Sequence, residues 1–314
     1  MMNRCTGQIS SEEATNKSNG NEPRVAHPLV LSHFQAKPLL DARKRGLERL
    51  RSSSDLGLSE SEAVLDENGA EFPGLGRVGW NDLEKIAESG TSCFALGDGG
   101  MEKIQAFSEA TGRPVSLYPT PGAPTVLVAG RSMHRIKGTD PWADTIQKIK
   151  AVEPVTGRVL DTTTGLGYTA ILAAKTAQRV DTVELDPVVS EIARLNPWSR
   201  GLFENPKIVR RIGDSFEVAD DLPEAAFSRI IHDPPEFALA GGLYSLKFYR
   251  KLFRLLAPGG RIFHYIGNPE SASGARNTAG VAKRLAEAGF ARVKACPAAF
   301  GLTAVKGARG FKEK

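Results

Sequence analysis

Short apolar runs alternate with longer amphipathic segments from residue 157 onward. The apolar runs predict buried strands, and the segments between them predict helices that begin at Asp-Pro pairs or end at glycine or proline. The predicted strands are 158–160, 180–184, 208–212, 227–232, 261–266, 291–295 and 302–305, and the predicted helices are 169–178, 186–195, 243–256 and 277–288. This alternation specifies an α/β fold, a Rossmann-like, doubly wound and mostly parallel sheet with helices on both faces.

The first 139 residues follow a different pattern. Residues 1–27 are rich in Ser, Asn, Glu and Thr, which predicts a disordered tail. Residues 28–139 hold short elements in no regular order and predict a smaller α+β domain that would recognise the substrate. Its predicted elements are a helix carrying Leu39 to Leu50, a hairpin at Asn68-Gly69, helices ending at Glu88 and spanning 102–110, and strands at 93–96, 115–118 and 125–129. Asp140-Pro141 then starts the second domain, 140–314.

Composition and charge restrict the compartment in which we expect the protein and the kinds of partner it could bind. The net charge of +5 is compatible with a nucleic-acid partner but does not require one. A basic helix face would be either a solvated surface or a phosphate-binding one, and its residues are Arg43, Lys44, Arg45, Arg49 and Arg51. The three cysteines form no C-x-x-C or Cys/His cluster, so we expect no metal and no disulfide framework. Because no apolar run is long enough for a membrane span or a signal peptide, we expect a cytoplasmic protein.

A glycine loop follows the first strand of the second domain, and we expect it to bind a cofactor. The candidate residues are Asp161, Thr162, Thr163, Gly165, Gly167 and Tyr168. Glycines let the backbone approach a ligand, and the helix that follows offers free N–H groups. The loop fits the G-x-G-x-x-A fingerprint of dinucleotide sites, although its first glycine comes late. An acid before a longer turn suits S-adenosylmethionine (SAM), whose ammonium group would suit Asp161. The loop alone leaves both cofactors open.

Acids also end the next two strands. Glu184 stands a little over 20 residues after Asp161, where a carboxylate can bind both hydroxyls of a ribose. Asp214 follows the third strand and would accept a hydrogen bond from the adenine amino group. Each acid could instead be a turn or helix-cap residue, but their regular arrival at strand ends favours a ligand site.

The fourth strand ends at Asp233-Pro234-Pro235. Two prolines make a rigid turn without N–H groups, so the carbonyls should stay free to point at a ligand. Together with Asp233 they would form a cluster of acceptors suited to an amino group that is to be alkylated. A rigid connection between strand and helix is the structural alternative.

The chain resembles the class I SAM-dependent methyltransferases, whose motifs match Asp161 to Thr169, Glu184, Asp214 and Asp233 to Pro235. More narrowly it resembles a family of predicted methyltransferases best represented in archaea, through the strings DTTTGLGYTAI, VELDP, LNPWS, HDPPEF, AGGLYS and FHYIGNP. That resemblance extends back to Ser132 to Arg135. It implies SAM as the cofactor and leaves the methyl acceptor open.

The motif departs from that of base-amino methyltransferases, because Glu236 intervenes before the aromatic residue Phe237. The spacing is closer to that of Asp-Pro-Pro-x-Phe ribosomal RNA methyltransferases. Covalent C5-pyrimidine chemistry is disfavoured, since no cysteine lies on the fourth or fifth strand. His264 on the fifth strand is either a proton acceptor or a packed core residue.

We therefore predict a SAM-dependent methyltransferase that alkylates a nucleophile, with an amino nitrogen favoured and RNA as one candidate acceptor. Asp233, Pro234 and Pro235 would orient the acceptor, and Phe237 would stack on it if it is planar. Three alternatives stay open: a small-molecule methyl- or aminopropyltransferase of the same fold, an NAD(P)-dependent oxidoreductase, and a SAM-binding module without catalysis. The sequence does not fix the oligomeric state.

Overall fold

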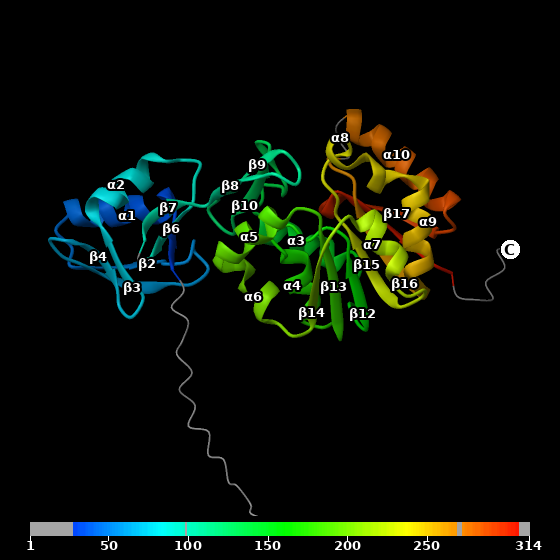
Figure 1. Ribbon diagram of the computed structural model, residues 1–314, viewed down its shortest axis with the longest axis horizontal. Helices are drawn as coiled ribbons and strands as arrows, with labels where there is room; N and C mark the ends of the chain where they lie inside the picture. Colours follow the sequence, from blue (N-terminus) through cyan, green and yellow to red (C-terminus); the bar gives the residue numbers. More distant parts are fainter. Residues whose placement is uncertain (1–27, 98, 269–271, 308–314) are drawn as a thin grey trace, which may run out of the picture.

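Seven strands form one sheet in the second half of the chain (Figure 1). The computed structural model describes residues 28–97, 99–268 and 272–307, so the tail predicted at 1–27 lies outside the described residues. The spatial order is β14 (Ile208–Ile212), β13 (Arg179–Glu184), β12 (Arg158–Asp161), β15 (Phe227–His232), β16 (Leu256–Tyr265), β18 (Gly301–Val305) and β17 (Ala291–Cys296). The first five are parallel, and the last two pair antiparallel. The predicted α/β fold with a mostly parallel sheet is confirmed.

Neighbouring residues of the central strands face opposite cores, as the pleat of a strand requires. Val159 and Ile231 belong to one hydrophobic core, whereas Leu160 and Ile230 belong to the other. The first core holds α3 (Pro141–Lys150), α4 (Tyr168–Ala174) and α5 (Pro187–Leu195), and the second holds α7 (Ser215–Asp221), α9 (Leu246–Leu255) and α10 (Ala272–Glu287). Strands buried on both faces read as continuous apolar runs, which is why the sequence pattern identified them.

Asp-Pro pairs set the start of two helices. The side chain of Asp140 accepts hydrogen bonds from the N–H groups of Trp142 and Ala143 at the start of α3. Asp186 caps α5 in the same way and receives two further hydrogen bonds from the N-terminal half, one from Ser108 Oγ at 2.8 Å and one from Thr111 Oγ1 at 2.7 Å. Asp186 therefore joins the two halves of the chain at one helix end.

Three small sheets make up the N-terminal half. Their orders are β1 (Leu29–Leu31)–β6 (Phe94–Gly97)–β7 (Gly100–Lys103), β2 (Arg49–Ser52)–β3 (Ser61–Leu65)–β4 (Gly69–Phe72)–β5 (Gly76–Gly79), and β11 (Arg131–Ser132)–β10 (Thr125–Val128)–β9 (Arg113–Tyr118)–β8 (Gln105–Ser108). The first two sheets form a lobe with α1 (His33–Lys44), α2 (Trp80–Glu88) and a core of its own. The third sheet lies between this lobe and α5 (Figure 1) and shares the first core of the large sheet. The division at residues 139 and 140 stays a prediction.

Two N-terminal expectations are wrong. The segment 102–110 forms parts of β7 and β8 rather than a helix, because pairing with β6 and β9 overrides the helix preference of its Glu, Lys and Ala residues. The helix expected to reach Leu50 ends at Lys44, since Gly46 adopts a left-handed φ of 67° and the chain turns into β2. The hairpin at Asn68-Gly69 is present as β3 and β4.

The basic residues of this region are largely paired. Arg43, Arg49 and Arg51 form ion pairs with acids, and their partners are Glu84, Glu62 and Glu60. These pairs favour a solvated surface over a phosphate-binding face. Within the described residues, no helix has the length and apolar composition that a membrane crossing needs.

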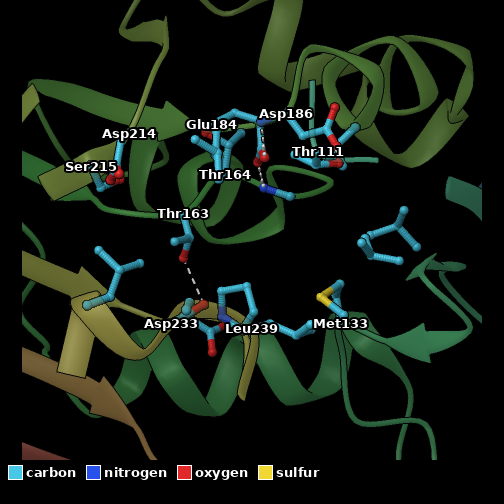
Figure 2. A pocket seen from close by; sticks show the side chains of 18 of the residues that line it. Thr111, Met133, Thr163, Thr164, Glu184, Asp186, Asp214, Ser215, Asp233 and Leu239 are labelled. Carbon is cyan, nitrogen blue, oxygen red and sulfur yellow. Dashed lines mark hydrogen bonds between the residues drawn. The ribbon is translucent and has the colours of Figure 1, made fainter. Parts of the chain in front are cut away.

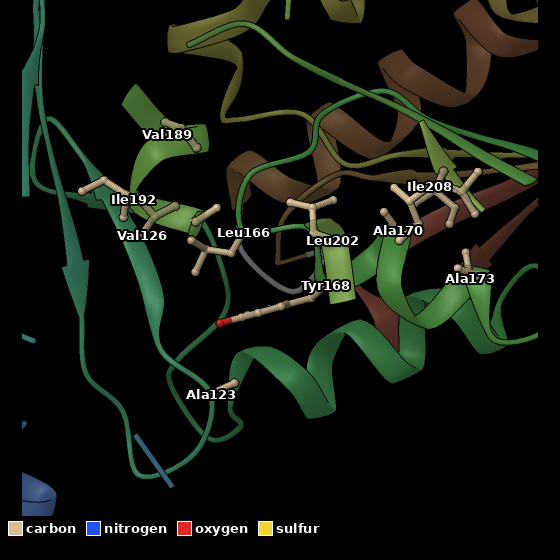
Figure 3. Close-up of a cluster of buried hydrophobic side chains, with 14 of the residues drawn as sticks. Ala123, Val126, Leu166, Tyr168, Ala170, Ala173, Val189, Ile192, Leu202 and Ile208 are labelled. Carbon is tan, nitrogen blue, oxygen red and sulfur yellow. The ribbon is translucent and has the colours of Figure 1, made fainter. Parts of the chain in front are cut away.

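The Tyr168 side chain lies in the first hydrophobic core (Figure 3), and its hydroxyl forms hydrogen bonds with two segments distant in sequence. It donates to the carbonyl of Pro124 at 2.9 Å and accepts from Asn196 Nδ2 at 2.9 Å, and the side chain is buried. Tyr168→Phe leaves the buried carbonyl of Pro124 without this donor. We expect a loss of about 1–3 kcal/mol in the free energy of unfolding, measured with urea.

The matched control is Tyr118→Phe on β9. Tyr118 is half-buried, and its hydroxyl makes no hydrogen bond within the part of the chain that the structure describes. This change should alter the free energy of unfolding by less than about 0.5 kcal/mol. Equal losses in the two variants would contradict the bridging role of Tyr168.

Candidate functional site

A cavity of about 370 Å³ opens where β12, β13, β14 and β15 end (Figure 2). The strand order reverses between β12 and β15, which is the usual place of a ligand site in such sheets. Seven of the predicted site residues line the cavity: Thr163, Gly165, Tyr168, Glu184, Asp214, Asp233 and Pro235. The sequence pattern thus located the position of the cavity, and the roles of these residues stay predictions.

Five other candidates lie outside the lining. Asp161 and Thr162 are buried beneath the loop, and Pro234 is buried in its turn. Gly167 faces a core residue, since a Cβ there would stand 2.6 Å from Leu202 Cδ2. Phe237 is 59% exposed on the short helix α8 (Phe237–Ala240), where its ring meets the edge of Tyr244. The position of Phe237 therefore does not support the expected stacking on an acceptor.

The two glycines of the loop serve different purposes. Both have positive φ, 53° at Gly165 and 78° at Gly167. A Cβ at Gly165 would meet open space, whereas Gly167 packs closely against Leu202 and begins α4. Gly165 leaves space in the cavity that a side chain would occupy, and Gly167 lets the loop pack closely against the core.

Glu184 binds the loop to the second strand. Its Oε2 accepts from the N–H of Gly165 at 2.7 Å, and its Oε1 accepts from the N–H of Asp186 at 3.1 Å. Burial raises the pKa of Glu184 to about 7, against the effect of these hydrogen bonds. The side chain lines the cavity and has lone pairs left for a ligand's hydroxyl groups.

Asp161 is the most enclosed acid near the cavity. Its Oδ2 accepts from Thr182 Oγ1 at 2.8 Å and from Thr169 Oγ1 at 3.0 Å. Its Oδ1 is buried and has no hydrogen-bond partner among the described residues. Burial raises the pKa of Asp161 to about 7. Because Asp161 lies outside the cavity lining, a ligand in the cavity would interact with its charge and not contact the carboxyl directly.

The carbonyls of the Asp233-Pro234-Pro235 turn are less free than expected. Thr163 Oγ1 donates to the carbonyl of Asp233 at 2.7 Å, and the Tyr244 hydroxyl donates to that of Pro235 at 2.9 Å. The expectation of free carbonyls is wrong for these two, because neighbouring hydroxyls reach them. The turn is held rigidly, and the side chain of Asp233 is the group it presents to the cavity.

Sequence reasoning missed Lys148, a buried cation beneath Asp233. Its Nζ lies 2.6 Å from Asp233 Oδ2 and 3.0 Å from Asp144 Oδ2, and its side chain is 1% exposed. Arg135 Nη1 lies 2.9 Å from Asp144 Oδ1, so these side chains form a row of alternating negative and positive charges. Burial opposes the charge of Lys148, but Asp233 and Asp144 raise its pKa above the ordinary value, so it stays protonated. The only sequence signal was an Asp–Lys pair at i, i+4, which usually marks an exposed helix face.

His264 is a core residue. It is fully buried, its Nε2 lies 2.8 Å from the Tyr249 hydroxyl, and its ring packs 4.3 Å from that of His232. Burial lowers the pKa of His264 well below the ordinary value. The packed-core alternative of the sequence analysis is therefore favoured over a proton acceptor.

The third N-terminal sheet supplies the wall opposite the strand ends. Its side chains in the lining come from β9, β10 and the adjoining segments, and they are Thr111, Arg113, Val126, Val128, Met133 and His134. These residues were not predicted, because short strands separated from the loop in sequence give no sign of facing it.

Comparison with known proteins gives a family but no activity for it. No family model matches the chain. An uncharacterized protein of Methanocaldococcus jannaschii, MJ1233, is 39% identical over 290 residues, which cover 90% of this chain and 98% of that protein. The chain belongs to the family of MJ1233.

Relatives with a named activity match shorter stretches. Polyamine aminopropyltransferase 2 of Streptomyces coelicolor is 30% identical over 180 residues, 54% of this chain and 30% of that protein. A polyamine aminopropyltransferase of Mycobacterium tuberculosis is 35% identical over 113 residues, 34% of this chain and 22% of that protein. The chain thus spans less than a third of the length of these two relatives.

A solved structure shows the same fold. It is a spermidine synthase in complex with the transition-state analogue AdoDATO, which aligns with a TM-score of 0.54 and 17% identity over 65% of this chain and 73% of its own. The class I methyltransferase-like fold is therefore confirmed.

The prediction of a SAM-dependent methyltransferase is wrong, because the matching relatives with a named activity are aminopropyltransferases. The physical reason lies in what the motifs recognise. A glycine loop with acids at the strand ends suits an adenosyl group on sulfur. It does not specify which of the groups on that sulfur is transferred.

The different roles of the two glycines can be tested by substitution. Gly165→Ala and Gly167→Ala both place a side chain at positive φ, but only the second forces Cβ against Leu202. Gly167→Ala should lower the free energy of unfolding by about 1–3 kcal/mol more than Gly165→Ala does. Urea unfolding of both variants measures the difference, and equal stabilities would show that Gly167 is not fitted to the core.

Proposed function

We propose that this chain transfers an aminopropyl group from decarboxylated SAM to a small amine. The observation that carries the proposal is the charge of the cavity. Among the described residues, four carboxylates line it, those of Glu184, Asp186, Asp214 and Asp233. The opposing cations are Arg113 in the lining and the buried Lys148 that pairs with Asp233, so the carboxylates are in excess. Decarboxylated SAM and an amine are both cations, whereas SAM brings a carboxylate that these side chains would repel. The similarity to polyamine aminopropyltransferases supports the same donor.

The residues present fit the donor. Glu184 would bind the ribose hydroxyls, and the open space at Gly165 leaves room for the sugar next to the loop. Asp214 would meet the adenine amino group, although one of its oxygens already caps α7. Asp161 is buried beneath the loop and outside the lining, so it would act on the donor's amino group through its charge and not by direct contact.

Decarboxylated SAM would supply an aminopropyl group on a positively charged sulfur. The acceptor ammonium would first lose one proton, which frees the lone pair of its nitrogen. That nitrogen would then bond to the carbon while the C–S bond breaks and sulfur keeps the electron pair, and the product would leave as a secondary ammonium ion. Asp233 would orient the acceptor nitrogen and accept the proton that it loses first. Lys148 and Thr163 hold Asp233 at the cavity wall through its Oδ2 and its carbonyl. The third N-terminal sheet closes the opposite side and limits the access of water.

The size of the cavity favours a small acceptor over RNA. Its volume of about 370 Å³ has to hold the donor as well as the acceptor. The arginines that could have met phosphates, Arg43, Arg49 and Arg51, are in ion pairs. An RNA partner therefore stays a prediction that rests on the net charge and on the Asp-Pro-Pro-x-Phe spacing.

The proposal is tested by incubating the protein with decarboxylated SAM and a set of primary amines, with SAM as the comparison donor. Mass spectrometry should find amines that are heavier by one aminopropyl group, and no methylated amines with SAM. Asp233→Asn should lower turnover by about 10²–10⁴-fold and leave the affinity for the donor nearly unchanged, because Asp233 would contact the acceptor.

The matched control is Asp220→Asn, an exposed acid on α7 that pairs with Lys251 away from the cavity. It removes the same charge and should keep full turnover. Donor binding without product from any amine would favour a binding module without catalysis. Methylated products from SAM would contradict the aminopropyl assignment.

A further inference from the structure

The cavity has two sides of different character. Figure 2 shows Glu184, Thr164, Asp186 and Thr111 along one side, and Asp233, Leu239 and Met133 along the other. On the first side, Thr164 and Glu184 belong to the ends of β12 and β13, where the donor would bind, and Thr111 comes from the segment between β8 and β9. The second side, which we call the acceptor side, begins at Asp233 and continues to the third N-terminal sheet.

The acceptor side is apolar beyond Asp233. Its apolar lining residues are Val126, Val128, Met133, Leu239 and Leu243. Val126 and Val128 are buried on β10, and Met133 packs against the same core. Beyond Asp233, none of the described residues that line this side is a carboxylate.

The acids around the acceptor side are paired with cations, and its histidine is neutral. Asp233 pairs with Lys148 at 2.6 Å. Glu236, on the adjoining turn, pairs with Arg131 at 2.7 Å. His134 lines the cavity with its Nδ1 bound to Thr125 at 2.9 Å, and burial lowers its pKa to about 3, so the ring is neutral. Arg113 of β9 also lines the cavity and adds a positive charge, so the acceptor side offers a second ammonium group no unpaired carboxylate.

We infer that the acceptor is a monoamine with an apolar chain, and that diamines and polyamines are poor acceptors. The inference rests on the proposed function. The reacting nitrogen would meet Asp233, and the rest of the molecule would lie along Val126, Val128 and Met133. A second ammonium group would lose its water there without gaining a carboxylate partner, which is strongly unfavourable. An alkyl chain of the same length gains from burial at the same place.

The experiment compares 1-aminobutane with 1,4-diaminobutane, which differ only by the second amino group. With decarboxylated SAM as donor, kcat/KM should be at least about 10-fold higher for the monoamine. Equal values, or a preference for the diamine, would overturn the inference and leave the proposed function intact. Product from neither of these amines, nor from longer or branched monoamines, would overturn the proposed function and this inference with it.

A substitution tests the cause of the preference. Met133→Glu places a carboxylate on the acceptor side and should shift the ratio of the two kcat/KM values toward the diamine by at least about 10-fold. Leu239→Glu places the charge on α8, which lines the same side of the cavity (Figure 2), and should act in the same direction. The test therefore does not depend on the folding of the first variant alone. Leu58→Glu changes the charge equally at an exposed position of the N-terminal lobe and should leave the ratio unchanged. An unchanged ratio in the two cavity variants would overturn the inference.

Discussion

Parallel strands bring their carboxyl ends to one edge of a sheet, and here that edge gathers four acids that would repel one another. The structure compensates each acid differently. Backbone N–H groups bind Glu184, threonine hydroxyls bind Asp161, the start of α7 binds Asp214, and Lys148 binds Asp233. The compensation is incomplete for Asp161 and Glu184, whose pKa values burial raises to about 7. A cationic ligand would complete it.

The groups that contact the acids come from elements distant in sequence, so the cavity depends on both halves of the chain. Lys148 reaches Asp233 from α3, which precedes the sheet, and is itself held by Asp144. Asp186 binds Ser108 and Thr111 and so fixes the third N-terminal sheet over the strand ends. The cavity wall is therefore part of the same packing as the sheet, as the shared hydrophobic core also indicates.

The sheet and the acids at its edge could be predicted, because both follow from local patterns: apolar runs, Asp-Pro caps and residues placed at strand ends. Three kinds of feature could not. Lys148 is buried by tertiary packing, although its spacing from Asp144 resembles an exposed helix pair. Met133 and Val126 face the cavity only because a separate sheet docks on α5. The segment 102–110 has helix-forming residues, and its strand pairing depends on partners elsewhere in the sequence.

The activity was mispredicted for a related reason. The motifs describe the half of the cavity that would hold an adenosyl group, and that half is the same whichever group leaves the sulfur. The deciding features are the excess of carboxylates in the lining and the apolar acceptor side. The carboxylate excess and the apolar acceptor side arise only in the folded protein, where the strands, α3 and the third N-terminal sheet pack together.

The most direct test of the central claim is a calorimetric titration with decarboxylated SAM and with SAM, repeated at several pH values around 7. The account predicts that decarboxylated SAM binds more tightly than SAM above pH 7, because the acidic cavity repels the extra carboxylate. Its affinity should fall as the pH drops through about 7, since protonation removes the charges of Glu184 and Asp161 that favour a cation. Tighter binding of SAM, or an affinity for decarboxylated SAM that does not change across this range, would contradict the account.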